Sequence, residues 1–171
     1  LRYNAGGSLD CVQLLATILV PSARMGTPMA YLEYNDKNID KSTTIDFDQE
    51  VLKTGTNLNQ NVLIVITSGT TAGAAEMLLT SLYKKDQYPN IIVMGSASKG
   101  QTVATEQFIN ETYRWSVNPV VCTVYNSDHV AGEEPFILTP SDQFKISETS
   151  IDGTTNYSQF LPFGDPKERM L

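Results

Sequence analysis

The feature that most constrains the fold is a pair of short apolar runs on either side of a helical segment. Residues 62–66 (Val-Leu-Ile-Val-Ile) and 91–94 (Ile-Ile-Val-Met) are continuous and carry no charge. Such runs are typical of strands buried on both faces of a sheet. Residues 76–85 show helical spacing, with an expected inward face of Met77, Leu78 and Leu82. Strand, helix and strand in this order predict a βαβ unit with parallel strands and a right-handed crossover.

The segment before this unit predicts a helix and a strand. A glycine turn at residues 4–8 precedes a run of apolar residues at helical spacing, Cys11, Leu14, Leu15, Ile18 and Leu19. Ser8 is the expected N-cap, and Pro21 should end the helix. Residues 28–34 are strand-like. Residues 35–60 are polar, and we expect little core there beyond one short helix near residues 47–53.

The C-terminal part predicts a β-hairpin and then mostly irregular chain. Residues 102–109 and 113–125 are rich in strand-forming residues, and Asn110-Glu111 between them reads as a turn. Residues 126–134 are expected to form a loop, and Asp165-Pro166 is a typical helix start. Together with the βαβ unit, this order predicts an α/β fold with a hairpin in its C-terminal part.

Composition and charge narrow the class of protein. The chain has 171 residues, of which 41% are hydrophobic and 18% charged, which is an ordinary balance for one globular domain. Its net charge of −7 and the lack of a basic run argue against a nucleic-acid partner, because phosphate backbones are bound by clustered Lys and Arg. No stretch reaches the roughly 18 apolar residues of a membrane span.

The cysteines and the single histidine bear on metal binding and redox state. Cys11 and Cys122 are far apart in sequence, and we favour two buried free thiols, although a disulfide stays open if the fold brings them together. With one histidine the chain has no Cys/His cluster of zinc spacing, so we expect no metal site and no cofactor. Leu1-Arg2-Tyr3 reads as the end of a strand, so we expect residues 1–171 to form a single domain that is incomplete at its N-terminus.

Five segments resemble, in order, the C-terminal-processing (tail-specific) serine peptidases, in particular a bacterial cell-envelope branch. They are residues 1–7, 32–37, 71–76, 93–101 and 164–166. The resemblance covers nearly the whole chain and implies a ClpP/crotonase-like α/β core. It also implies an upstream PDZ-type domain, a peptide or protein C-terminus as partner, and a location in the cell envelope, either periplasmic or lipoprotein-anchored.

The resemblance implies that both members of the catalytic dyad are replaced. The family's nucleophile is a serine in a pattern like Thr-Ala-Ser-Ala-Ser-Glu, and alignment on Thr71, Ala72 and Glu76 places it at Gly73. The family's general base is the lysine of a Gly-Lys pair, and the matching position holds Gln101. A Ser–Lys dyad needs a hydroxyl and a neutral amine. The aligned site should therefore not cleave peptides through an acyl-enzyme.

The backbone part of such a site is expected to remain. In the family, main-chain N–H groups near the glycine turn and after the nucleophile form an oxyanion hole, which implies Gly6 or Gly7 and Ala74 here. The N-terminus of the following helix adds a positive dipole end. These features favour a degenerate peptidase that binds a peptide or a carboxylate in the former cleft. The glycines could equally serve only a tight turn.

Three alternatives remain open. The chain could be an active serine endopeptidase in which Gly73 was engineered from Ser. It could instead use a displaced dyad, with Ser98 or Ser96 as nucleophile and a relocated lysine as base. Ser68, Lys84 and Lys99 also lie nearby, and turn and capping chemistry already explains the serines. It could also be a structural half-domain whose recognition surfaces lie elsewhere.

Other polar and aromatic features have simpler interpretations. His129 lies in a polar segment and is expected to be exposed, and residues 95–100 lack the spacing of a phosphate-binding loop. The acidic residues between 36 and 50 lack the spacing of an EF-hand, so we read them as a solvated face. Tyr113, Trp115 and Tyr125 have strand spacing and are expected to pack in the core or at a sheet edge.

Overall fold

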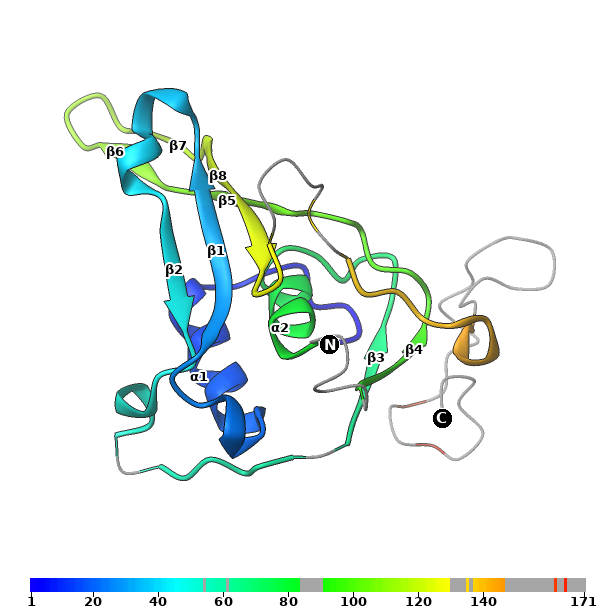
Figure 1. The fold of residues 1–171 in the computed structure, drawn as a ribbon. Coiled ribbons are helices and arrows are strands. Elements are labelled where there is room, and N and C mark those ends of the chain that lie inside the picture. The colour runs from blue at the N-terminus through cyan, green and yellow to red at the C-terminus, as the bar shows by residue number, and fades with distance from the viewer. Residues whose placement is uncertain are drawn as a thin grey trace, which may run out of the picture.

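A computed structural model describes residues 1–53, 55–60, 62–83, 91–129, 135, 137–146, 162 and 165. The loop expected after residue 129 and the helix start expected at Asp165-Pro166 therefore lie largely outside the described residues. Lys84, one of the alternative dyad residues, also lies outside them. Within the described part the chain has the mixed α/β architecture that the sequence predicts (Figure 1).

The largest sheet is antiparallel and has four strands in the order β2-β1-β8-β5. Its strands are β1 (Pro28–Tyr34), β2 (Thr43–Asp46), β5 (Val103–Thr105) and β8 (Val120–Asn126). β1 has the predicted bounds, and it pairs along its length with β8, with Leu32 opposite Val124. β2 was not predicted, because its sequence Thr-Thr-Ile-Asp is short, polar and exposed apart from Ile45.

The second sheet is the predicted parallel pair. β3 (Leu63–Thr67) and β4 (Ile91–Gly95) lie side by side with Val65 opposite Val93, and α2 (Ala74–Leu82) connects them along the chain. The expectation that this pair is buried on both faces is wrong for β3, since Ile64 is 60% exposed while Val65 is only 8% exposed. A two-stranded sheet with the core on one side buries alternate residues only.

The two α-helices pack against each other beneath the four-stranded sheet. α1 (Leu9–Leu19) begins at Ser8, whose hydroxyl accepts a hydrogen bond from the N–H of Cys11 at 3.2 Å, so the predicted cap is confirmed. The apolar residues noted at helical spacing do not form its buried face, since Leu14 and Leu15 are exposed. The side chains of Val12, Ala16 and Val20 face the core instead, because small and β-branched residues allow α1 to approach α2 closely.

The hydrophobic core joins both helices to β1 and to the segment after β2. Its buried members are Val12, Ala16, Val20, Met29, Ala30, Phe47, Met77, Leu78 and Leu82. Leu63 and Ile91 of the parallel pair pack against the same cluster. α2 therefore lies between the two sheets (Figure 1).

The predicted hairpin is present but broken into two ladders. β5 pairs with β8, and beyond a break at residues 106–107 and 118–119, β6 (Phe108–Asn110) pairs with β7 (Trp115–Val117). Pro119, which has no N–H to donate, lies in the break. Figure 1 shows the β6–β7 ribbon at one end of the molecule. Four short 3₁₀ helices complete the described chain, Ser22–Arg24, Asp36–Lys41, Gln49–Leu52 and Asp142–Phe144.

Two expectations for single side chains are corrected by this arrangement. Tyr113 and Trp115 are 78% and 48% exposed, so neither is a core residue, although Trp115 lies in β7, at the edge of a sheet, which was the other expected position. His129 is half-buried rather than exposed, because β1 and β8 place Tyr31 opposite Tyr125 and the imidazole packs on both rings, with centroids 5.0 and 4.0 Å away.

Candidate active-site cleft

The positions predicted for the nucleophile and the base lie next to each other. Gly73 is the N-cap of α2, and a Cβ atom at this position would lie 3.7 Å from Nε2 of Gln101 and 3.8 Å from its Cδ. The same atom would lie 3.9 Å from the Cα of Gly6. A side chain at position 73 would thus meet the end of side chain 101. In this chain the meeting point holds a carboxamide and no hydroxyl or amine.

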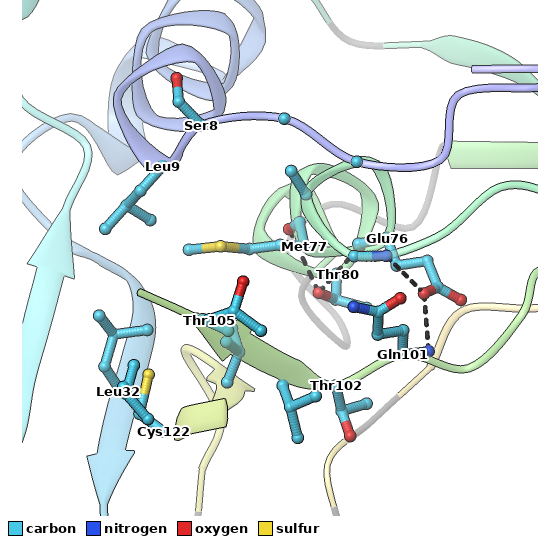
Figure 2. A pocket seen from close by; sticks show the side chains of 18 of the residues that line it. Ser8, Leu9, Leu32, Glu76, Met77, Thr80, Gln101, Thr102, Thr105 and Cys122 are labelled. Atoms are coloured by element: carbon cyan, nitrogen blue, oxygen red, sulfur yellow. Dashed lines mark hydrogen bonds between the residues drawn. The ribbon is translucent and has the colours of Figure 1, made fainter. Parts of the chain in front are cut away.

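Glu76 holds these two positions together. Its side chain is 4% exposed, and its carboxylate accepts hydrogen bonds from three main-chain N–H groups, those of Gly73 at 2.9 Å, Gly100 at 2.6 Å and Gln101 at 2.8 Å. The bond to Gly73 is the half of a capping box in which the residue three positions into the helix reaches back to the N-cap. The other two bonds fasten the 100–101 segment to the first turn of α2 (Figure 2).

The residues expected to form an oxyanion hole also lie together. A Cβ atom on Gly7 would be 3.7 Å from the Cβ of Ala74, so the glycine turn runs along the N-terminus of α2. Asn4 fixes this turn from both sides, because its side-chain oxygen accepts from the N–H of Gly6 at 3.0 Å and its carbonyl accepts from the N–H of Ala72 at 3.0 Å. No motif in the sequence predicted this role of Asn4.

These residues line a cleft of about 490 Å³, within the size range of ligand pockets. Gly6, Gly7, Gly73, Ala74 and Gln101 all border it. The rest of the lining forms a largely apolar wall, to which α1, α2 and the four-stranded sheet contribute Leu9, Leu32, Met77, Val103, Cys122 and Val124. Figure 2 shows Leu32 and Cys122 of the four-stranded sheet facing the α2 side of the cleft. This apolar wall was not predicted from the sequence. The alternation of side chains along β1 and β8 could have indicated which residues of these strands face the cleft.

The ionisable groups on this wall are biased toward their neutral forms. Burial raises the pKa of the Cys122 thiol above its ordinary value, although a backbone hydrogen bond from Ala104 acts in the opposite direction. Burial also raises the pKa of the nearby Tyr34 hydroxyl, with smaller contributions from Cys122 and Glu106. The Cys122 thiol and the Tyr34 hydroxyl thus stay uncharged near neutral pH, and the carboxylates that border the cleft are those of Glu76 and Glu106.

The alternative nucleophiles occupy structural positions. The Ser68 hydroxyl lies 2.9 Å from that of Thr70 and accepts from the N–H of Tyr3, and the Ser96 hydroxyl donates to the carbonyl of Ile146 at 3.0 Å. The Ser98 hydroxyl differs from these two, since it is buried and has no hydrogen-bond partner within the described ranges. The side chain of Lys99 is exposed. Cys11 and Cys122 are both free thiols, but Cys11 is exposed, contrary to expectation.

Among the described residues, no three His, Cys, Asp or Glu side chains gather as metal ligands would. None of the helices in the described ranges combines the length and the hydrophobicity needed to cross a membrane.

The fold and the cleft together define a peptidase-like chain of the C-terminal-processing type, and comparison with solved structures confirms this relationship. A protein from Bacteroides fragilis described as an S41 protease is 37% identical to this chain, with a TM-score of 0.77 over 96% of the chain. The chain spans only 40% of the length of that relative. The α/β class is thereby confirmed, while the ClpP/crotonase-like core stays a prediction.

Two more distant structures share the fold. A lipoprotein from Streptococcus agalactiae is 22% identical to this chain, with a TM-score of 0.59. The match covers 88% of this chain and 48% of the lipoprotein. A photosystem II D1 C-terminal processing protease is 16% identical, with a TM-score of 0.56. The match covers 90% of this chain and 36% of the protease. No protein-family profile matches the chain, and no curated protein does.

Proposed function

We propose that this tail-specific-protease-like chain binds a peptide or carboxylate ligand in its cleft without cutting it. The observation that carries the proposal is the contact between positions 73 and 101, where a Cβ atom on Gly73 would lie 3.7 Å from Nε2 of Gln101. A serine hydroxyl at position 73 would lie one bond beyond this Cβ and would reach the end of side chain 101, yet glycine has no side chain and a glutamine amide is not a base near neutral pH.

The remaining groups of the cleft suit a ligand with a carbonyl or carboxylate next to an apolar side chain. The N-terminus of α2, a helix of nine residues, provides main-chain N–H groups and the positive end of its dipole. Gln101 adds amide N–H donors at the same point. The apolar wall formed by Leu32, Met77 and Val124 would then contact the side chain.

Binding is tested by titrating the protein with short peptides that end in an apolar residue. We expect saturable binding in isothermal titration calorimetry, with the peptides recovered intact after long incubation. A matched peptide with an amidated C-terminus shows which group is bound. If the cleft binds the terminal carboxylate, amidation weakens binding, and if it binds an internal carbonyl, amidation leaves the affinity unchanged. Absence of binding for both peptides would contradict the proposal.

The alignment itself is tested by restoring the missing groups. The double variant Gly73→Ser/Gln101→Lys should gain peptide hydrolysis and react with a fluorophosphonate probe, while each single variant should do neither, because dyad members act as a unit. Circular dichroism should first show that the double variant is folded. A folded double variant without any labelling would contradict the assignment of positions 73 and 101.

The second candidate function is an active serine endopeptidase, through a displaced dyad or because Gly73 replaces an original serine. Among the candidate nucleophiles, Ser98 is the one whose hydroxyl has no hydrogen-bond partner in the described part of the chain, so a displaced dyad is best tested at this residue. Stoichiometric fluorophosphonate labelling of the unchanged protein, lost in Ser98→Ala, would establish it. No labelling of the unchanged protein is the result expected from our proposal.

We also infer the setting of the chain within a larger protein. Residues 1–171 would form one domain of a cell-envelope protein, periplasmic or lipoprotein-anchored, with a PDZ-type domain upstream. The shared fold of a streptococcal lipoprotein is consistent with this setting. Cell fractionation with an antibody against residues 1–171 tests it, and recovery in the cytosolic fraction would contradict it.

A further inference from the structure

The β6–β7 ribbon is the most exposed apolar element of the described chain. Every residue from 111 to 120 is exposed, and the ribbon carries large apolar side chains without cover, namely Phe108, Ile109, Tyr113, Trp115 and Val117. A two-stranded ribbon is marginally stable in water on its own. Exposed aromatic residues gathered on one element are typical of interfaces.

One face of the ribbon is continuous and apolar. Phe108 lies opposite Val117, and Asn110 lies opposite Trp115. Opposite residues, and residues two apart along a strand, project from the same face. Phe108, Trp115 and Val117 therefore form one patch, and their exposed fractions of 45%, 48% and 50% show that water reaches all three. The other face carries Ile109 opposite Ser116.

The charges around this patch indicate what covers it. Residues 108–120 contain one acid, Glu111, and one base, Arg114, so the ribbon is neutral in a chain of net charge −7. A single arginine beside a glutamate gives little attraction for an anionic membrane. A second copy of the chain, in contrast, can approach here without the repulsion that its acidic surface meets elsewhere.

The positions of two charges also favour a two-fold arrangement. Arg114 is exposed at the tip of the ribbon, and Glu106 is exposed at its base, two residues before Phe108. If two ribbons pack face to face and run in opposite directions, the tip of each meets the base of the other. Each arginine then faces a glutamate of the other copy, and the two-fold symmetry produces this ion pair twice.

We propose that two copies of this chain associate face to face through Phe108, Trp115 and Val117 of the β6–β7 ribbon, with Arg114 of each copy opposite Glu106 of the other. The three apolar side chains form the centre of the interface, and the two ion pairs fix its orientation. Glu106 also borders the cleft described above, so the ion pair at the base of the ribbon adjoins the proposed ligand site, whereas Phe108, Trp115 and Val117 do not line the cleft.

Sedimentation equilibrium of the chain tests this proposal over a range of protein concentrations. We expect a monomer–dimer equilibrium, and we expect Trp115→Ser to raise its dissociation constant by about tenfold or more. The control is Leu15→Gln, which changes a side chain of similar exposure, 46% against 48%, on α1. This control should leave the dissociation constant unchanged. Circular dichroism verifies that each variant is folded.

The orientation is tested by exchanging charges at exposed positions, which leaves the fold intact. Arg114→Glu alone should weaken the dimer because it places like charges together, and Glu106→Arg/Arg114→Glu should restore it. A chain that stays monomeric at its highest soluble concentration would overturn the proposal, and so would a dimer insensitive to Trp115→Ser. A blue shift of Trp115 fluorescence on zwitterionic lipid vesicles, in a monomeric protein, would overturn it in favour of membrane contact.

Discussion

The backbone conformation at position 73 favours a residue without a side chain. Gly73 starts α2 with φ +55° and ψ −116°, a region that residues with a Cβ atom rarely adopt. The space around it is not the obstacle, since a Cβ atom there would make only ordinary van der Waals contacts of 3.7 Å and more. A serine at this position would thus fit the cleft but hold a strained backbone, and the glycine of this chain relieves that strain.

This reasoning predicts that Gly73→Ala lowers the free energy of unfolding by about 1–3 kcal/mol, the usual cost of a residue held in such a conformation. Urea denaturation measures the change. Gly69→Ala is the matched control, because Gly69 lies in the preceding turn with no atom within 4 Å of a new Cβ and no positive φ. Equal losses in the two variants would show that backbone conformation is not the cause.

The buried thiol of Cys122 gives a second prediction at this scale. Burial raises its pKa in the folded protein above the ordinary value of 9.0 for a thiol. At pH values between the unfolded and the folded pKa, the unfolded chain loses the proton while the folded chain keeps it, so stability falls as pH rises. The slope contributed by this group is at most about 1.4 kcal/mol per pH unit.

Chemical denaturation from pH 7 to 10 measures this slope, and Cys122→Ala should make it smaller. Alkylation gives an independent test, because the exposed Cys11 should react with iodoacetamide in the folded protein and Cys122 only after unfolding. Equal alkylation rates of the two thiols in the folded protein would contradict the prediction.

Among the helices and strands, the end of α2 depends on a residue far away in sequence. Arg24 is 5% exposed, and its guanidinium donates to the carbonyls of Leu82 at 2.5 Å and Ser81 at 3.1 Å. It also lies 4.8 Å above the ring of Phe47. A cation at a helix C-terminus satisfies its last carbonyls and opposes the negative end of the dipole. Arg24 thus joins the end of α2 to the core.

We expect Arg24→Met to lower the free energy of unfolding by about 3 kcal/mol, because two hydrogen bonds from a charged donor are lost and buried carbonyls stay unpaired. Arg24→Lys keeps the charge without the planar fork and should recover part of the loss. Thermal and urea denaturation compare the two variants. A lysine variant as unstable as the methionine variant would show that geometry alone matters, and a stable methionine variant would contradict the role of Arg24.

The success of sequence reasoning also differs from element to element. β1, the start of α1 at Ser8 and the parallel pair were predictable, because local capping and continuous apolar runs determine them. β2 and the inward face of α1 were not, because pairing with β1 and contact with α2 decide them. The adjacency of positions 73 and 101 followed from the family resemblance, whereas the three bonds to Glu76 that create it have no local signal in the sequence.

At the scale of the whole molecule, burial is concentrated around α2 and falls toward the ribbon. Leu79, Ser81 and Leu82 of α2 are at most 1% exposed, and the helix lies between two sheets. The β6–β7 ribbon is exposed apart from the half-buried Asn110, and it is joined to the rest of the fold through the break at residues 106–107 and 118–119. Two regions of one chain should thus differ in local stability.

Hydrogen exchange measures this difference directly. In dilute protein we expect the amides of α2 to exchange only through global unfolding, and those of the β6–β7 ribbon to exchange through local opening at a much lower free energy. Raising the protein concentration should slow exchange in the ribbon alone if a second copy covers it, and Trp115→Ser should abolish that effect. Ribbon amides as protected as those of α2 in dilute protein would contradict the stability gradient. A concentration effect spread evenly over both regions would instead indicate association through another surface.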